Sequence, residues 1–292
     1  MVVLQSLVSK LVLLVLCGVG LPLSASQVQQ KPSTAAANVQ LLAEPFQITG
    51  LNRSRQLRIY LPPDYANSNQ RYPVLYIHDG QNVFDAATAF SGEWGVDETL
   101  NQLAAEGWLE LIVGAIDNGA QHRMSEYSGW DHPRYGAGEG ELYVRFITDT
   151  VKPYIDSHYR TRPEPVYTGI MGSSMGGLIS HYALFNQPGV FSKAGIFSPS
   201  YWYADAVYTQ TNINVLPADS RISLLVGDKE GRDMVNNTQK MAALLRQQGF
   251  AASSLSVKTI AGAEHNEAFW RSEFSDAVLF LFNPAAFYLR QR

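Results

Sequence analysis

Cysteine is almost absent from this chain: the 292 residues contain one, Cys17, and it lies within an apolar run near the N-terminus. If that run is removed during export, the remaining chain has no thiol. It then has no disulfide, no cysteine nucleophile and no thiolate ligand for a metal ion. The sequence therefore excludes a small module held together by disulfides and favours a larger domain with its own hydrophobic core.

The chain also lacks clusters of basic residues, and its 22 Lys and Arg residues are outnumbered by 26 Asp and Glu residues. Nucleic acids and anionic membranes are therefore poor candidates for partners. No histidine and carboxylate spacing matches a pair of metal ligands on one face of an element. No G-x-G-x-x-G pattern for a dinucleotide is present either. The sequence predicts a protein that needs no metal ion and no cofactor.

Residues 1–26 have the anatomy of a secretory signal peptide. A single positive charge at Lys10 precedes the apolar run 11–23, and small residues follow it. This pattern predicts cleavage near Ala25 or Ser26 and a periplasmic or secreted protein that makes no membrane contact after cleavage. The alternative is a retained N-terminal anchor, although the apolar run is short for a helix that spans a membrane.

The rest of the chain is expected to form one domain. Residues 27–43 are rich in Gln, Ser, Ala and Asn, which is typical of a flexible leader, and 44–292 show no repeat and no linker. Strands are expected at 46–49, 56–61, 73–78, 109–116, 166–171, 193–197, 222–227 and 254–260. Helices are expected at 96–106, 141–158, 175–186, 234–248 and 267–282. The first two strands look like a hairpin, and the later alternation predicts an α/β fold with a mainly parallel sheet and helices on both faces.

A G-x-S-x-G motif, Gly172 to Gly176, lies between the strand 166–171 and the helix 175–186. At a strand-to-helix junction this motif is typical of a nucleophile elbow, a strained turn that exposes a serine hydroxyl above the end of the sheet. Ser174 is therefore the candidate nucleophile. The alternative is a glycine-rich turn with no part in catalysis.

A serine hydroxyl needs a base to take its proton, and His265 is the best placed of the 6 histidines. It follows the last predicted strand and precedes the last predicted helix. An α/β-hydrolase carries its histidine there, after the serine and the acid in chain order. The alternative is an ordinary surface histidine.

The third member of such a triad is a carboxylate on a loop between the serine and the histidine. The loop after strand 222–227 offers three. Glu230 is the preferred acid because it lies past the strand end and before the next helix. Asp228 is the second candidate, whereas Asp233 is expected to cap the helix that starts at Met234.

An oxyanion hole needs two N–H donors that point toward the developing negative charge. One is the amide of Met175, the residue after the nucleophile. The other is expected from the turn after strand 73–78, where the amide of Gln81 follows Gly80. The alternative for this segment is a plain β-turn.

Five segments stand out in this order: YIHDGQNVFD (76–85), TGIMGSSMGGLIS (168–180), FSPSYW (197–202), VGDKEG (226–231) and GAEHNEAFW (262–270). Together they resemble the putative-esterase family, which contains feruloyl and acetyl-xylan esterases, enterochelin esterases, S-formylglutathione hydrolases and mycolyltransferases. The resemblance implies an α/β-hydrolase fold with Ser174 as nucleophile, His265 as base and Glu230 as acid. It also implies that the amides of Gln81 and Met175 form the oxyanion hole.

Aromatic residues are frequent on the loops near the expected site, and four of them are predicted to bind substrate: Trp94, Trp130, Tyr201 and Trp202. Aromatic faces suit sugar rings, phenolic acyl groups and catechols. The sequence thus predicts an exported serine esterase that acts on acyl groups of polysaccharides or on other small extracellular esters. The alternatives are a periplasmic siderophore esterase of the enterochelin type and an acyltransferase. A non-catalytic binding module is disfavoured because both the serine and the histidine are present.

Overall fold

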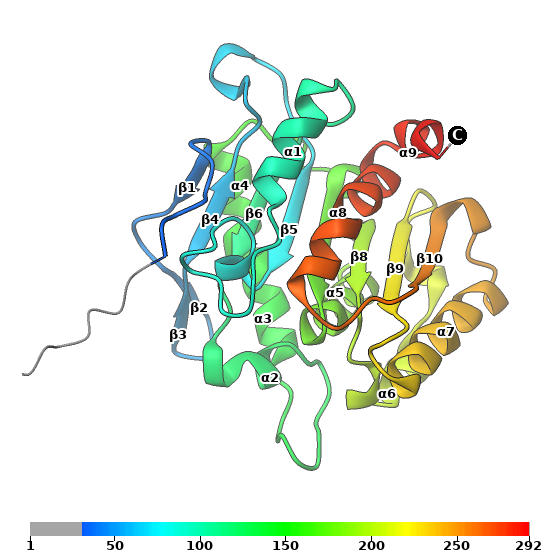
Figure 1. The fold of residues 1–292 in the computed structure, drawn as a ribbon. Helices are drawn as coiled ribbons and strands as arrows, with labels where there is room; N and C mark the ends of the chain where they lie inside the picture. The colour runs from blue at the N-terminus through cyan, green and yellow to red at the C-terminus, as the bar shows by residue number, and fades with distance from the viewer. Residues whose placement is uncertain (1–30, 292) are drawn as a thin grey trace, which may run out of the picture. The chain divides into compact units, whose positions relative to one another are not determined.

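An eight-stranded sheet forms the centre of the domain in the computed structural model, which describes residues 31–291 (Figure 1). The predicted signal peptide and residues 27–30 of the predicted leader lie outside the described residues. In spatial order the strands are β1 (Val39–Leu41), β4 (Leu57–Tyr60), β6 (Ile112–Ile116), β5 (Val74–His78), β7 (Thr168–Ser173), β8 (Lys193–Phe197), β9 (Arg221–Gly227) and β10 (Leu255–Ile260). Strand β4 pairs antiparallel with β1 and β6 and so runs against the other strands of this sheet. The pairings from β6 across to β10 are all parallel. The predicted mainly parallel α/β fold is confirmed.

Helices cover both faces of the sheet and create two hydrophobic cores. One core lies under α1 (Val96–Ala105), α8 (Glu267–Phe282) and α9 (Pro284–Arg290). The other lies under α3 (Gly140–Phe146), α4 (Lys152–His158), α5 (Met175–Asn186) and α7 (Arg232–Gln247). The central strands are buried along their whole length and mostly apolar, because both of their faces are covered. The short helices α2 (Arg123–Glu126) and α6 (Ala206–Gln210) lie on connections.

Most predicted elements are present, including α5 and α8 with their expected bounds. The predicted helix 141–158 is α3 and α4 joined by a π-helical segment, Ile147–Val151. Helix α7 begins at Arg232 after a Gly231 cap, so Asp233 lies within its first turn and is not the cap. Carboxylates in the first turn of a helix are favoured by the helix dipole, which explains the acid at this place.

Two expectations for the N-terminal part were wrong. The hairpin pairs β2 (Phe46–Ile48) with β3 (Arg53–Arg55), while the expected second strand, β4, joins the main sheet instead. The later part of the expected flexible leader is ordered, because β1 pairs along β4 at the sheet edge. The side chain of Asn38 also donates a 2.6 Å hydrogen bond to the carbonyl of Leu61. A three-residue edge strand has too little periodicity to be found in a sequence, since its pairing comes from a distant segment.

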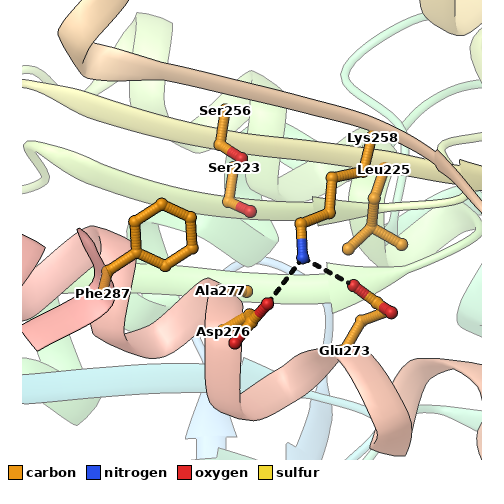
Figure 2. A pocket seen from close by; sticks show the side chains of 8 residues that line it. All are labelled: Ser223, Leu225, Ser256, Lys258, Glu273, Asp276, Ala277 and Phe287. Carbon is orange, nitrogen blue, oxygen red and sulfur yellow. Dashed lines mark hydrogen bonds and ion pairs between the residues drawn. The ribbon is translucent and has the colours of Figure 1, made fainter. Parts of the chain in front are cut away.

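A half-buried ion cluster connects β10 to α8 (Figure 2). Lys258 Nζ lies 3.0 Å from Glu273 Oε2 and 2.8 Å from Asp276 Oδ2. The pocket at this cluster has a free volume of about 0 Å³, so the cluster holds two elements together and leaves no room for a ligand. No helix within residues 31–291 has the length and apolar character needed to cross a bilayer.

Candidate active site

Ser174 lies between the end of β7 and the start of α5, at the carboxyl edge of the parallel strands, where α/β folds bind their ligands. Its backbone has φ 60° and ψ -122°, an unusual conformation for a residue with a side chain. The chain can turn this sharply because Gly172 has no Cβ, which would lie 2.8 Å from the backbone of Gly176. Strain of this kind at a G-x-S-x-G motif is characteristic of a nucleophile elbow.

His265 and Glu230 form a hydrogen-bonded pair beyond the ends of β9 and β10. His265 Nδ1 donates to Glu230 Oε2 at 2.7 Å, because an ionised carboxylate can only accept. The other oxygen of Glu230 accepts from the amide of Gly227 at 2.7 Å. The Glu230 carboxylate is fully buried and therefore held in one orientation. This arrangement leaves Nε2 of His265 free to accept a proton.

Asp228, the second candidate for the acid, has a different partner. Its carboxylate accepts a 2.8 Å hydrogen bond from the amide of Gly262, at the start of the loop that carries His265. Asp228 thus shapes that loop but does not contact the imidazole. Of the two candidate acids, the structure brings only Glu230 to His265.

Ser174 and His265 line one cavity of about 540 Å³. The Ser174 hydroxyl lies 3.3 Å from that of Ser200, which is its side-chain partner among the described residues. The cavity's other lining residues are His78, Asp79, Gln81, Asn82, Phe90, Ser91, Trp94, Asn118, Ala120, Arg123, Ser173, Glu267 and Trp270. The cavity is large enough for a small ester or for one end of a larger one.

The amides of Gln81 and Met175 both lie where helical segments begin. Met175 is the first residue of α5, and Gln81 lies within the short 3₁₀ segment Gly80–Asn82. N–H groups at the start of a helical segment have no carbonyl of that segment to bond, so they can bind an anion. Gly80 is needed here because a Cβ would lie 2.7 Å from a carboxylate oxygen of Asp117.

An ion pair that the sequence did not reveal fixes the turn that carries Gln81. Asp79 has φ 56°, and Arg123 donates to both of its carboxylate oxygens, at 2.6 and 2.8 Å. Asn118 adds a 2.7 Å bond to Asp79, and its amide donates to Oε1 of Gln81 at 3.0 Å. Burial raises the pKa of Asp79, but the charge of Arg123 outweighs it and holds that pKa below its usual value. The turn is therefore held by hydrogen bonds to the carboxylate of Asp79 and to the side chain of Gln81.

Ser198 is a second residue that the sequence did not reveal. Its hydroxyl donates to Glu230 Oε1 at 2.6 Å and accepts from the indole Nε1 of Trp270 at 2.9 Å. Ser198 directly follows β8 and has φ 46°. The position of Ser198 after a strand end could have marked it as a candidate site residue. The residues around it in the sequence do not indicate that its side chain would face the loop after β9.

His78, at the end of β5, lines the cavity but is buried in the core. Its Nδ1 lies 2.9 Å from the hydroxyl of Tyr143. Burial lowers the pKa of His78 to about 3, so its ring is neutral at physiological pH. His78 is thus a neutral ring that packs in the core and bonds to Tyr143.

The four aromatic residues expected to bind substrate lie in different places. Trp94 lines the cavity, as does Trp270, whereas Trp130, Tyr201 and Trp202 are not among its described lining residues. Trp130 and Tyr201 are buried and hydrogen bond to polar side chains of α6 and α5. Trp202 is 47% exposed and packs against a neighbouring aromatic loop. Only the general region of these residues could be predicted from the sequence, because the direction of a loop side chain depends on tertiary packing.

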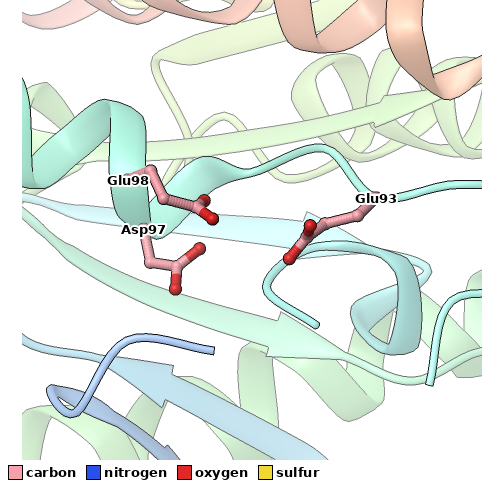
Figure 3. A group of neighbouring side chains, drawn as sticks. All are labelled: Glu93, Asp97 and Glu98. Atoms are coloured by element: carbon pink, nitrogen blue, oxygen red, sulfur yellow. The ribbon is translucent and has the colours of Figure 1, made fainter. Parts of the chain in front are cut away.

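Three carboxylates that could hold a metal ion lie close together at the start of α1, namely those of Glu93, Asp97 and Glu98 (Figure 3). Asp97 Oδ2 accepts from the amide of Ala36 at 2.7 Å, so this group holds the N-terminal segment against α1. Burial raises the pKa of Asp97, which favours its protonated form. Arg271 lies 3.7 Å from Glu93 and supplies a positive charge at the edge of the group. These contacts account for the group as a structural anchor.

Comparison with known proteins identifies relatives of this chain. The family model described as "Putative esterase" matches residues 48–281. The chain is similar to the uncharacterized protein YbbA of Bacillus subtilis (strain 168), with 28% identity over 243 residues that cover 78% of this chain and 93% of that protein. It is also similar to an endo-1,4-beta-xylanase/feruloyl esterase of Xylanibacter ruminicola, with 24% identity over 238 residues. That match covers 80% of this chain but only 30% of the relative.

Solved structures show the same fold. The BES protein from Bacillus cereus is similar with a TM-score of 0.69 at 19% identity, covering 86% of this chain and 98% of that one. The enterobactin esterase FES from Shigella flexneri gives a TM-score of 0.66 at 16% identity, covering 87% of this chain and 62% of that one. The sheet with one antiparallel strand, the elbow and these likenesses establish an α/β-hydrolase fold. Because the family model matches most of the described domain, the chain belongs to the putative esterase family and is a carboxylic ester hydrolase.

Proposed function

We propose that this protein is an exported serine esterase in which Ser174 is the nucleophile, His265 the general base and Glu230 the residue that orients the imidazole. The observation that carries the proposal is the pair of His265 and Glu230, 2.7 Å apart, in a cavity that also exposes the elbow serine. Serine, imidazole and a buried carboxylate are the groups that acyl transfer requires.

The reaction follows from this arrangement. Ser174 Oγ attacks the ester carbonyl while His265 Nε2 takes the hydroxyl proton, and the carbonyl oxygen becomes an oxyanion. The amides of Gln81 and Met175 donate to that oxyanion. The intermediate collapses, the alcohol leaves with the proton from His265, and the acyl group remains on Ser174. A water molecule then attacks the acyl group on Ser174 while His265 again takes the proton. This step releases the carboxylic acid and restores the serine hydroxyl.

The imidazolium that forms in both half-reactions faces the carboxylate of Glu230. The two groups are already hydrogen bonded in the free protein, so the enzyme need not reorganise to stabilise the new charge. The Ser174 hydroxyl points to Ser200 in the free protein and has to turn to His265 when substrate binds. Catalytic hydrogen bonds often tighten only in the substrate complex.

Export rests on the charge and hydropathy pattern of residues 1–26. A positive residue, an apolar run and a small-residue cleavage site direct a chain to the secretory pathway. The esterase would then act in the periplasm or outside the cell. Its substrates would be esters present there, such as acyl groups on polysaccharides.

The cavity supports substrates with an aromatic or sugar ring, because Trp94 and Trp270 line it together with Phe90. A phenolic acyl ester fits this surface and agrees with the feruloyl esterase activity in the name of the Xylanibacter relative. A catechol-bearing siderophore ester is the second candidate, since the same aromatic surface would accept its ring. A phenolic acyl esterase should hydrolyse methyl ferulate fastest, whereas a siderophore esterase should hydrolyse a catecholate triester fastest.

Hydrolysis by the mature protein and by its Ser174→Ala variant tests the proposal. The substrates would be p-nitrophenyl acetate, methyl ferulate, acetylated xylan and a catecholate triester. We expect turnover by the wild type and about a thousandfold or greater loss in the variant. Ser157→Ala, which removes an exposed hydroxyl from α4, is the matched control and should retain activity. Equal rates from the wild type and Ser174→Ala would overturn the assignment of the nucleophile.

A further inference from the structure

Glu267 is a carboxylate in the catalytic cavity that the proposed reaction does not use. It is the first residue of α8, two positions after His265, and it is 7% exposed. Its side chain lines the same cavity as Ser174 and His265. Any substrate bound for attack by Ser174 therefore shares this cavity with the Glu267 carboxylate.

No Lys, Arg or His within residues 31–291 lies within ion-pair distance of Glu267. Its one hydrogen bond to another side chain in that range comes from Asn82 Nδ2, at a long 3.5 Å. Arg123 is already paired with Asp79, and His265 with Glu230. Burial raises the pKa of Glu267 and outweighs the hydrogen bond from its own backbone amide, which acts in the opposite direction. The Glu267 carboxylate therefore keeps hydrogen-bonding capacity toward the cavity, because its partners are its own backbone amide and the long bond from Asn82.

Glu267 is not needed to cap its helix. The side chain of Asn266 already accepts from the amide of Phe269 at 3.0 Å, which is the usual capping bond. An acid in the first turn adds a small favourable interaction with the helix dipole, but an exposed residue would supply it as well. A buried polar group without strong partners costs stability, so its presence in a binding cavity is expected where a ligand satisfies it.

The neighbouring loop holds Glu267 at the cavity wall. Gly92 packs so closely that a Cβ there would lie 3.2 Å from the Cβ of Glu267. Asn82 Oδ1 accepts from the amide of Phe90 at 3.1 Å, which turns the Nδ2 group of Asn82 toward Glu267. Phe90 itself is 93% exposed and lines the cavity. A polar group thus lies beside an apolar surface that a substrate can cover.

The geometry points to a polar subsite formed by Glu267 and Asn82, which binds a hydrogen-bond donor, a hydroxyl or an ammonium group, on the ester substrate. This inference deepens the proposed function and rests on it. A carboxylate accepts strongly from either donor, and Asn82 can add a bond to a hydroxyl oxygen. The esterase would then prefer esters whose apolar portion ends in such a group over esters of the same size that end in a methyl group.

A matched series of methyl esters tests this preference. The acyl chains would increase in length and end in a methyl, a hydroxyl or an ammonium group, and kcat/KM would be measured for each. We expect the wild type to favour one of the donor-bearing esters by about tenfold or more at the best length. Glu267→Leu should reduce that ratio to near one. Glu267→Gln should keep part of a hydroxyl preference but lose an ammonium preference, which identifies the donor.

Glu264→Gln is the matched control, because it removes an exposed acid from the same loop outside this cavity. It should leave the ratio unchanged. Since a structural defect would lower all rates together, the ratio separates recognition from misfolding. The subsite would be overturned if the wild type hydrolysed all three ester types equally. It would also be overturned if Glu267→Leu kept the wild-type ratio of kcat/KM between donor-bearing and methyl-ended esters.

Binding to Ser174→Ala, followed by the fluorescence of Trp94 and Trp270, tests the subsite separately from turnover. If the wild type hydrolyses none of the esters while Ser174→Ala still binds the donor-bearing esters more tightly, the proposed reaction fails and the subsite stands. If esters are hydrolysed without any donor preference in rate or in binding, the reaction stands and the subsite fails.

Discussion

Ser198 donates a 2.6 Å hydrogen bond to the same oxygen of Glu230 that accepts from the Gly227 amide, while the other oxygen of Glu230 faces His265. The Glu230 carboxylate is therefore held by three hydrogen bonds, from Ser198 after β8, from Gly227 at the end of β9 and from His265. Trp270, which lines the cavity, donates in turn to Ser198. The orientation of the His265 imidazole thus depends on Ser198 and Trp270 as well as on Glu230.

Replacing Ser198 with Ala should lower kcat about tenfold, because Glu230 would lose one of the bonds that hold it. KM should change less, since Ser198 does not line the cavity. Steady-state kinetics of the single variants and of the double variant Ser198→Ala with Glu230→Gln would check this. If Ser198 acts through Glu230, the two effects are strongly non-additive. Independent, multiplicative losses would contradict that role.

Glu230→Gln should reduce kcat by about a thousandfold or more, because the amide can neither stabilise the imidazolium nor hold its tautomer. Asp228→Asn, on the same loop, is the matched comparison. Asp228 bonds to Gly262 and not to His265, so this variant should lose a little thermal stability and keep most of its activity. The reverse order of the two kcat values would show that Asp228 is the acid.

The ion pair of Asp79 and Arg123 should make stability depend on pH. The pKa of Asp79 is lowered in the folded protein, so the pair contributes stability at pH values above the pKa of the unfolded chain and loses it as the pH falls through the folded pKa. Arg123→Leu leaves the buried carboxylate without its cation and should cost about 3 kcal/mol at neutral pH. Without the cation, burial favours the protonated form of Asp79. The difference in the free energy of unfolding between the wild type and Arg123→Leu should therefore narrow as the pH falls toward about pH 3.

Urea unfolding of the wild type and Arg123→Leu across this pH range would measure that difference. Arg134→Leu is the control, because Arg134 lies on an exposed loop and makes no ion pair within residues 31–291. A difference that stays constant with pH would contradict the electrostatic origin of the effect.

The three residues of the proposed triad could be predicted from the sequence because each depends on local order along the chain. A strand, a G-x-S-x-G turn and a helix identify Ser174, and the ends of the last two strands identify the loops of Glu230 and His265. The supporting contacts were not predictable in this way. Asp79 and Arg123 are 44 residues apart and meet only because β5 and β6 are neighbours in the sheet. The partner of a loop side chain depends on strand order, which a single sequence does not specify.

The elbow offers a stringent test, because its geometry depends on one missing methyl group. In Gly172→Ala the new Cβ would lie 2.8 Å from the backbone of Gly176, and neither the strand nor the helix can yield easily. We expect a loss of about 2 kcal/mol or more in stability and a larger loss in kcat, since the Ser174 hydroxyl would be displaced. Gly189→Ala is the matched control, because a Cβ at Gly189 meets no atom within 4 Å. Thermal unfolding and kcat of both variants would be compared with the wild type, and a Gly172→Ala enzyme with full activity would show that the turn is not the catalytic elbow.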